Sequence, residues 1–351
     1  MLYWKKLINF PMQTNHKLFI NQNNEIGCAV KNANGNEAFE LMHKELDKVW
    51  NEVARVTKDG GFVAINIGDA TRKIGTYFQL YSNHTRITSK FIELGFDVLP
   101  LILWKKTANS PNKFMGSGML PAGAYITLEH EYILIFRKGH KREFLIKEQK
   151  KNRRESAFFW EERNVWFSNI WDLKGVKQSL TDGNLRKRSA AYTMELPYRL
   201  INMYSCKGDT VLDPFLGTGT TMFASSILER NSIGVEIESN FLETIHNGFK
   251  QITLQSHDIV QERVERHISF IQRYKHSKGL PKYVNSNHGF EVITSQETDL
   301  LLSIVSGFDV NQNVFNVEYQ KFNNESDYIT HYSQECRHQK LTKANLLPQL
   351  L

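Results

Sequence analysis

The chain has 351 residues, 41% of them hydrophobic, which is enough for one large core or two unequal domains. Its three cysteines are far apart. They predict neither a disulfide framework nor a Cys-x-x-Cys metal site, and they favour a reducing, cytoplasmic location. No stretch reaches the ~20 apolar residues of a membrane span, and no signal peptide is visible. The net charge of +7 suits a polyanionic partner such as nucleic acid.

The first half of the chain predicts alternating helices and strands. Residues 1–36 are polar and rich in Asn, without clear periodicity. Apolar spacing then predicts helices over 37–57 and 82–94, and strands over 62–67, 97–104 and 132–136. The segment 105–124 is rich in Gly, Pro, Ser and Asn, which indicates a loop. This alternation is typical of an α/β layer fold.

A basic and aromatic segment, residues 137–188, interrupts the alternation. After it, the pattern predicts helices over 195–204, 219–230, 240–254 and 257–275, and strands over 209–213 and 232–237. The last part of the chain is polar and weakly patterned. We therefore expect four parts: 1–136, 137–188, 189–255 and 256–351.

The strongest motif is Asp-Pro-Phe-Leu-Gly-Thr-Gly-Thr-Thr at 213–221, where an apolar strand leads through a glycine turn into a helix. Gly217 and Gly219 let the backbone take positive φ and approach a ligand closely. The helix start offers free N–H groups. A second strand ends at Glu236, whose carboxylate can accept hydrogen bonds from both hydroxyls of a ribose.

Two other nucleotide-binding motifs do not match this turn. A phosphate-binding loop requires Gly-Lys-Ser/Thr, but Thr220-Thr221 follow the glycine here. The dinucleotide fingerprint requires a third glycine, and Met222 stands in its place. A bare Gly-x-Gly could be an ordinary turn, whereas the whole string with its acidic partner is far more specific.

The string 213–221 resembles the cofactor motif of the amino-group DNA methyltransferases, and the resemblance covers most of residues 10–250. It implies a Rossmann-like sheet with helices on both faces, S-adenosylmethionine as the cofactor, and the motif order of the beta subgroup. Residues 190–197 resemble the motif that holds the methionine part of the cofactor. The implied cofactor-binding residues are Asp213, Pro214, Phe215, Gly217, Gly219, Thr220, Thr221, Glu236, Tyr192 and Thr193.

The chain departs from this family at the catalytic motif, a Ser/Asp/Asn-Pro-Pro-Tyr/Phe loop at a strand end. The best match is Asn9, Phe10 and Pro11, with Phe10 as the ring that stacks on a flipped base. Leu7 stands where the polar acceptor is expected, and little chain precedes the loop to form its strand. Two alternatives stay open: a working variant, or a truncated or decayed catalytic half.

Target recognition is expected from the basic segment that interrupts the fold and from the loop 105–124. Their cations can neutralise phosphates, which makes binding dependent on salt. The predicted DNA contacts are Lys105, Lys106, Lys150, Lys151, Arg153 and Arg154. Asp69, after the strand at 62–67, is either a pocket residue or an ordinary solvated strand end. His130 faces away from Glu129 and Glu131 on a strand, so no metal site is expected.

The resemblance implies a DNA methyltransferase that transfers methyl from S-adenosylmethionine to an exocyclic amine of double-stranded DNA, with N4 of cytosine favoured over N6 of adenine. Cys206 lacks a Pro-Cys context, which argues against a cysteine nucleophile. A cognate restriction endonuclease is an expected partner, and no membrane is. The alternatives are an inactive protein that only binds DNA and cofactor, and an RNA or protein methyltransferase with the same fold.

Overall fold

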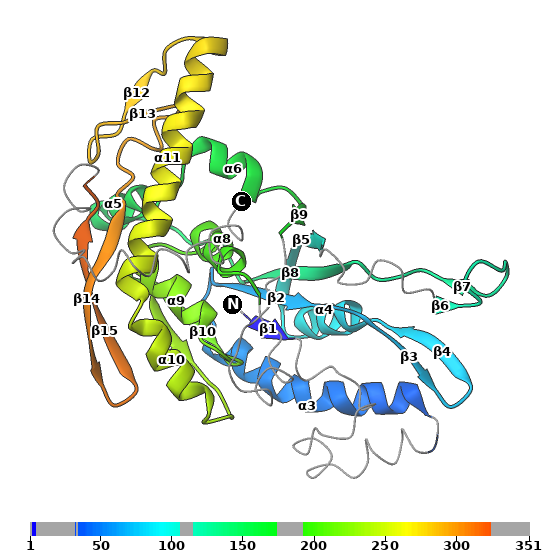
Figure 1. Cartoon of the computed structure of the whole chain (residues 1–351). Coiled ribbons are helices and arrows are strands. Elements are labelled where there is room, and N and C mark those ends of the chain that lie inside the picture. Colours follow the sequence, from blue (N-terminus) through cyan, green and yellow to red (C-terminus); the bar gives the residue numbers. More distant parts are fainter. Residues whose placement is uncertain (1, 5–31, 33, 106–114, 174–191, 324–351) are drawn as a thin grey trace, which may run out of the picture. The chain divides into compact units, whose positions relative to one another are not determined.

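The computed structural model describes residues 2–4, 32, 34–105, 115–173 and 192–323. The chain forms two compact units (Figure 1). The N-terminal unit comprises residues 2–142 and 169–190, and the C-terminal unit comprises residues 143–168 and 191–351. Residues 143–168, the middle of the basic and aromatic segment, belong with the C-terminal unit, and the four expected parts stay a prediction.

The N-terminal unit is built on a five-stranded mixed sheet in the order β1-β2-β8-β5-β9. Its strands are β1 (Leu2–Trp4), β2 (Phe62–Ile67), β5 (Phe96–Lys105), β8 (His130–Lys138) and β9 (Ile170–Asp172). Strand β1 runs parallel to β2, with Trp4 opposite Ile67, and the remaining neighbours are β2–β8 and β8–β5 antiparallel and β5–β9 parallel. A strand therefore does precede the expected catalytic loop.

Helices α3 (Gly35–Val56) and α4 (Asn83–Glu93) supply the core of this unit. Trp50 of α3 and Phe91 of α4 are fully buried, and Phe91 stacks on Phe136 of β8 with ring centroids 4.4 Å apart. Asn34 begins α3 by accepting the Glu37 N–H at 3.1 Å. Such burial of large aromatic side chains is the main favourable contribution to folding.

Two short hairpins complete the N-terminal unit, and the sequence pattern predicted neither. One consists of β3 (Ala70–Ile74) and β4 (Tyr77–Tyr81), and the other of β6 (Met115–Gly116) and β7 (Ala124–Tyr125). Residues 105–124 were expected to be a loop, but their end takes part in this second hairpin.

The C-terminal unit contains the parallel pair β10 (Thr210–Asp213) and β11 (Asn231–Gly234), connected by α9 (Thr220–Ile227). Its other helices are α5 (Lys147–Glu155), α6 (Trp160–Trp166), α8 (Glu195–Tyr204), α10 (Phe241–Phe249) and α11 (Ile252–Lys278). The long α11 lies along the hairpin of β14 (Ser303–Asn311) and β15 (Val314–Lys321), and β12 (Tyr283–Val284) pairs with β13 (Glu291–Val292) (Figure 1).

The mixed α/β class is as predicted, and most helices and strands begin and end near the expected residues. Helix α9 is shorter than expected because the chain turns sharply at Glu229, which has a φ of 59°. The weakly patterned end of the chain contains two hairpins. Among the described residues, no helix has the length and apolar character needed to cross a membrane.

Candidate functional site: the glycine turn and its acidic partners

The glycine turn joins the end of β10 to the start of α9. Gly217 and Gly219 have φ values of 57° and 87°, a backbone region that L-residues with side chains seldom adopt. A Cβ on Gly217 would meet nothing closer than the Phe215 carbonyl at 4.0 Å, whereas one on Gly219 would lie 3.1 Å from Ile245. Gly217 therefore borders open space. Gly219 begins α9 without a capping side chain.

Asp213 lies at the end of β10 and is 2% exposed. Its Oδ1 accepts the Phe215 N–H at 3.0 Å, but its Oδ2 has no hydrogen-bond partner among the described residues. Burial raises the pKa of the Asp213 carboxyl, while the hydrogen bond from the Phe215 backbone opposes that rise. A buried acceptor that lacks a donor is costly, which suits a ligand that brings one.

Glu236 follows β11 and is tied to the glycine turn. Its Oε2 accepts the Gly217 N–H at 2.7 Å, and its Oε1 accepts the Glu238 N–H at 2.9 Å. The parallel pairing of β10 and β11 brings these groups together, because it places Asp213 opposite Gly234. Each carboxylate oxygen keeps acceptor capacity for a further donor.

Tyr192 and Thr193, which precede α8, lie beside this turn. The Tyr192 hydroxyl hydrogen-bonds to the Thr221 hydroxyl, and burial together with the nearby Asp213 carboxylate raises the pKa of Tyr192. The Thr193 side chain is buried, and its hydroxyl has no hydrogen-bond partner among the described residues. Pro214, Phe215 and Thr220 are half-buried within the turn. The ten predicted cofactor-binding residues thus gather in one unit, and their roles stay a prediction.

The predicted catalytic residues Asn9, Phe10 and Pro11 lie outside the described residues. Strand β1, which precedes them in the chain, ends side by side with β2, and these two ends form one edge of the sheet. Asp69 follows β2 at this edge, and its side chain is 2% exposed. It accepts the backbone N–H of His84 at 3.1 Å and contacts the His84 ring, so it holds the start of α4 rather than standing solvated.

An aromatic stack, which sequence spacing did not predict, lies beside Asp69. The His84 ring stacks on Tyr132 with centroids 3.9 Å apart, and His130 meets Tyr132 edge to face at 4.8 Å. Glu131 is buried and accepts the Asn66 side-chain amide at 2.8 Å. The described residues contain no group of three or more His, Cys, Asp or Glu side chains that could hold a metal ion.

The predicted DNA contacts divide into exposed and internally bonded cations. Lys105, Lys150, Lys151 and Arg153 are exposed, whereas Lys106 lies outside the described residues. Arg154 donates to Asp299 and, at 2.8 Å, to the Thr298 hydroxyl, so its guanidinium already has partners within the protein. Lys151 also pairs with Glu155 at 3.6 Å and the Arg153 guanidinium lies 4.6 Å from the Phe144 ring centroid, but both side chains stay exposed to solvent.

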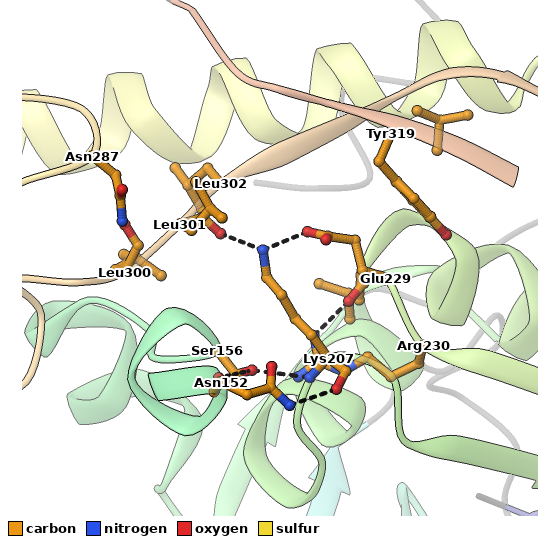
Figure 2. A network of polar contacts seen from close by, with 12 residues as sticks. Asn152, Ser156, Lys207, Glu229, Arg230, Asn287, Leu300, Leu301, Leu302 and Tyr319 are labelled. Atoms are coloured by element: carbon orange, nitrogen blue, oxygen red, sulfur yellow. Dashed lines mark hydrogen bonds and ion pairs between the residues drawn. The ribbon is translucent and has the colours of Figure 1, made fainter. Parts of the chain in front are cut away.

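Within the C-terminal unit, helix α5 is fixed through the turn at Lys207 (Figure 2). The Asn152 side chain donates to the Lys207 carbonyl at 2.9 Å, and the Lys207 N–H donates to the Ser156 hydroxyl at 2.9 Å. The Lys207 ammonium group in turn donates to the Leu301 carbonyl and pairs with Glu229 (Figure 2). Helix α5 is thereby anchored on one side, and its exposed cations lie elsewhere on its surface.

Comparison with known proteins shows the family to which the chain belongs. The family model "DNA methylase", of the N6/N4 class, matches residues 7–247. The type II methyltransferase M.MthZI of Methanothermobacter thermautotrophicus is 55% identical over 82% of this chain and 81% of its own length. M.MjaI of Methanocaldococcus jannaschii is 52% identical over 61% of this chain and 70% of its own length.

One similar solved structure is TTHA0409 of Thermus thermophilus, crystallised in complex with S-adenosyl-L-methionine. It is 32% identical, covers 62% of this chain and 79% of its own, and superimposes with a TM-score of 0.51. The match to the family model includes the glycine turn, both acids and the segment that contains Asn9 to Pro11. The chain therefore belongs to the N6/N4 DNA methylase family.

Proposed function

We propose that this chain is the modification enzyme of a type II restriction-modification system, and that it transfers methyl from S-adenosylmethionine to an exocyclic amine of a base in double-stranded DNA. The single observation that carries the proposal is the buried Asp213 carboxylate, with its unpartnered Oδ2, beside the Gly217–Gly219 turn and Glu236. The relatives M.MthZI and M.MjaI bear the type II name.

The residues around the turn fit the cofactor. Asp213 and Thr193 offer buried polar atoms that suit the amino and carboxyl groups of a methionine moiety, and Glu236 retains acceptor capacity for ribose hydroxyls. Gly217 borders open space that a side chain would fill. When bound, the cofactor supplies an electrophilic methyl group on a sulfonium.

On the DNA side, the residues supply proximity and orientation, with no covalent nucleophile. We assign Asn9 as the hydrogen-bond acceptor that directs the amine lone pair and Phe10 as the ring against the extruded base, with Pro11 completing the loop. The parallel end of β1 beside β2 supports this assignment, because it provides the strand that such a loop follows. N4 of cytosine stays the predicted target.

The decisive test is the transfer of labelled methyl to an unmethylated plasmid by the purified chain. We expect labelled DNA. Nuclease digestion would then identify the methylated base, and sequencing would locate the site. A plasmid methylated in this way should also resist the restriction endonuclease that cuts at the mapped site, which tests the proposed partner.

Two variants refine the test. Asp213→Asn should abolish detectable transfer and weaken cofactor binding in calorimetry, while the exposed Glu243→Gln of the same unit should leave both unchanged. Cofactor binding without any transfer to DNA would contradict the proposal and favour the second candidate function, a protein that binds DNA and cofactor without turnover. Label in RNA instead of DNA would point to the third alternative.

A further inference from the structure

Two projections of the N-terminal unit expose large apolar side chains. We name them the arms: the β3–β4 hairpin, residues 70–81, and the segment 115–128 that contains β6 and β7. Tyr77 is 76% exposed on the first arm, and Met119, Leu120 and Ile126 are 89%, 70% and 88% exposed on the second. Monomeric proteins rarely leave such a group uncovered unless it meets a partner.

The two arms form one continuous surface. Phe78 of the first arm stacks on Tyr125 of the second, with ring centroids 4.4 Å apart. The first arm is held against α3, because Gln79 donates to the Asn36 side chain at 2.6 Å and Tyr81 is only 4% exposed. Figure 1 shows both hairpins extending away from the five-stranded sheet. The exposed side chains of the arms therefore project from a base that is packed against α3.

Met119 and Leu120 lie at the tip of the second arm, in a turn closed by Ser117. The Ser117 N–H donates to the Gly123 carbonyl at 2.9 Å, and its hydroxyl donates to the Leu120 carbonyl at 2.6 Å. This bonding fixes the turn from both sides. It presents two adjacent apolar side chains on a narrow, hydrogen-bonded tip.

The position and charge of the arms identify their partner. The first arm begins directly after Asp69, at the carboxyl end of β2, and the second arm leads into β8, whose Tyr132 pairs with Ile67 of that same end. Ligands of open α/β sheets bind at this edge. The two arms, residues 70–81 and 115–128, contain no Asp or Glu, and their charged residues are Arg72 and Lys73. An apolar surface that carries positive charge and no negative charge is complementary to stacked bases flanked by phosphates.

We propose that the Met119–Leu120 tip enters the base stack of double-stranded DNA next to the target base and supports its extrusion, while the cations of the arms contact flanking phosphates. The inference rests on the proposed function. An amine inside a duplex is out of reach until its nucleotide leaves the stack. Apolar side chains inserted between base steps offset the cost of unstacking.

The test uses the full chain and a duplex that carries the site mapped on the plasmid. Its target base is paired in one version and lies opposite an abasic position in the other, where extrusion costs little. The double variant Met119→Ser/Leu120→Ser should have a kcat/KM about tenfold or more below that of the wild type on the paired duplex. On the abasic duplex, its kcat/KM should be close to that of the wild type. Cofactor affinity should not change. Leu280→Ser/Val284→Ser is the matched control, because both side chains are exposed in the other unit.

The outcomes separate the inference from the function on which it rests. Equal losses on both duplexes, or unchanged activity on the paired one, would overturn the inference while the proposed function stands. A wild-type dimer that the tip variant converts to a monomer in light scattering would assign the arms to contact between copies, and would also overturn it. Absence of transfer by the wild type to the plasmid would remove the proposed function and this inference together.

Discussion

The Gly217 N–H donates to Glu236 Oε2 at 2.7 Å, which ties the glycine turn to the end of the neighbouring strand. The two residues are 19 positions apart in the chain, and the parallel pairing of β10 and β11 brings them together. One carboxylate thereby shapes the turn and keeps capacity to accept from a ligand. This double role makes Glu236 the most informative single position of the predicted cofactor site.

Replacing Glu236 by Gln should weaken the binding of S-adenosylmethionine about 10- to 100-fold, because hydrogen bonds to a charged group contribute about 1.5–3 kcal/mol. The amide keeps one acceptor oxygen for the Gly217 N–H and loses the acceptor of the Glu238 N–H, so the turn should hold with a small fall in melting temperature. Titration calorimetry measures the dissociation constant, with Glu243→Gln as the control. Unchanged affinity would show that Glu236 only shapes the turn.

The pH dependence of stability should follow buried His43, which contacts the Asn83 side chain at 3.1 Å. Burial lowers the pKa of His43 to about 4. The folded state thus stays neutral while the unfolded chain takes up a proton below about pH 6.5, so stability is full above that value and is lost as the pH falls towards 4. At pH 5 the loss attributable to His43 is about 2 kcal/mol.

Urea unfolding at pH 7.5 and pH 5 measures this loss. His43→Gln can still donate to Asn83 but does not titrate, so it should be less stable at neutral pH and show a smaller difference between the two pH values. The idea would be falsified if the variant lost as much stability between pH 7.5 and pH 5 as the wild type.

The sequence predicted the central helices and strands well because buried strands and amphipathic helices have clear apolar periods. Strand β2 and helix α8 lie where they were expected, at 62–67 and 195–204. The string 213–221 also located the glycine turn, since a strand, two glycines and a helix start are adjacent in the chain. Local pattern was sufficient wherever the determining residues are close together in sequence.

Longer-range features could not be predicted in this way. The hairpin of β3 and β4 has mixed burial, and its pairing depends on α3, which lies some forty residues earlier in the chain. Arg154 looked like a free DNA contact, but its partner Asp299 is 145 residues away. Asp69 was expected to be either a pocket residue or a solvated strand end, but the fold places it at the start of α4. Each of these depends on tertiary contacts that no spacing reveals.

The ion pair of Lys207 and Glu229 should stabilise the C-terminal unit (Figure 2). Lys207 lies just before β10, and its ammonium group also donates to the Leu301 carbonyl, just before β14. Both side chains are largely buried, so removing one leaves the other charge poorly compensated. Lys207→Met should cost about 3 kcal/mol, and Lys207→Met/Glu229→Gln should cost less than the sum of the two single changes. Denaturant unfolding of the four proteins measures the coupling energy. Additive losses would mean that the pair contributes no mutual stabilisation.

The exposed cations of α5 should set the salt dependence of DNA binding, whereas Arg154 should not. Lys147, Lys150 and Lys151 lie three and four residues apart on one helix face, and that face ends at Arg154, which is bonded to Asp299. Each phosphate that the protein no longer neutralises should reduce the slope of log K against log salt by about 0.9. Lys147→Gln/Lys150→Gln should therefore reduce the slope by about 2, with an unchanged melting temperature.

Arg154→Gln should lower the melting temperature and leave the slope nearly intact. Fluorescence anisotropy of a labelled duplex at several salt concentrations distinguishes the two, and a flat response to the double lysine change would place the DNA elsewhere than on α5.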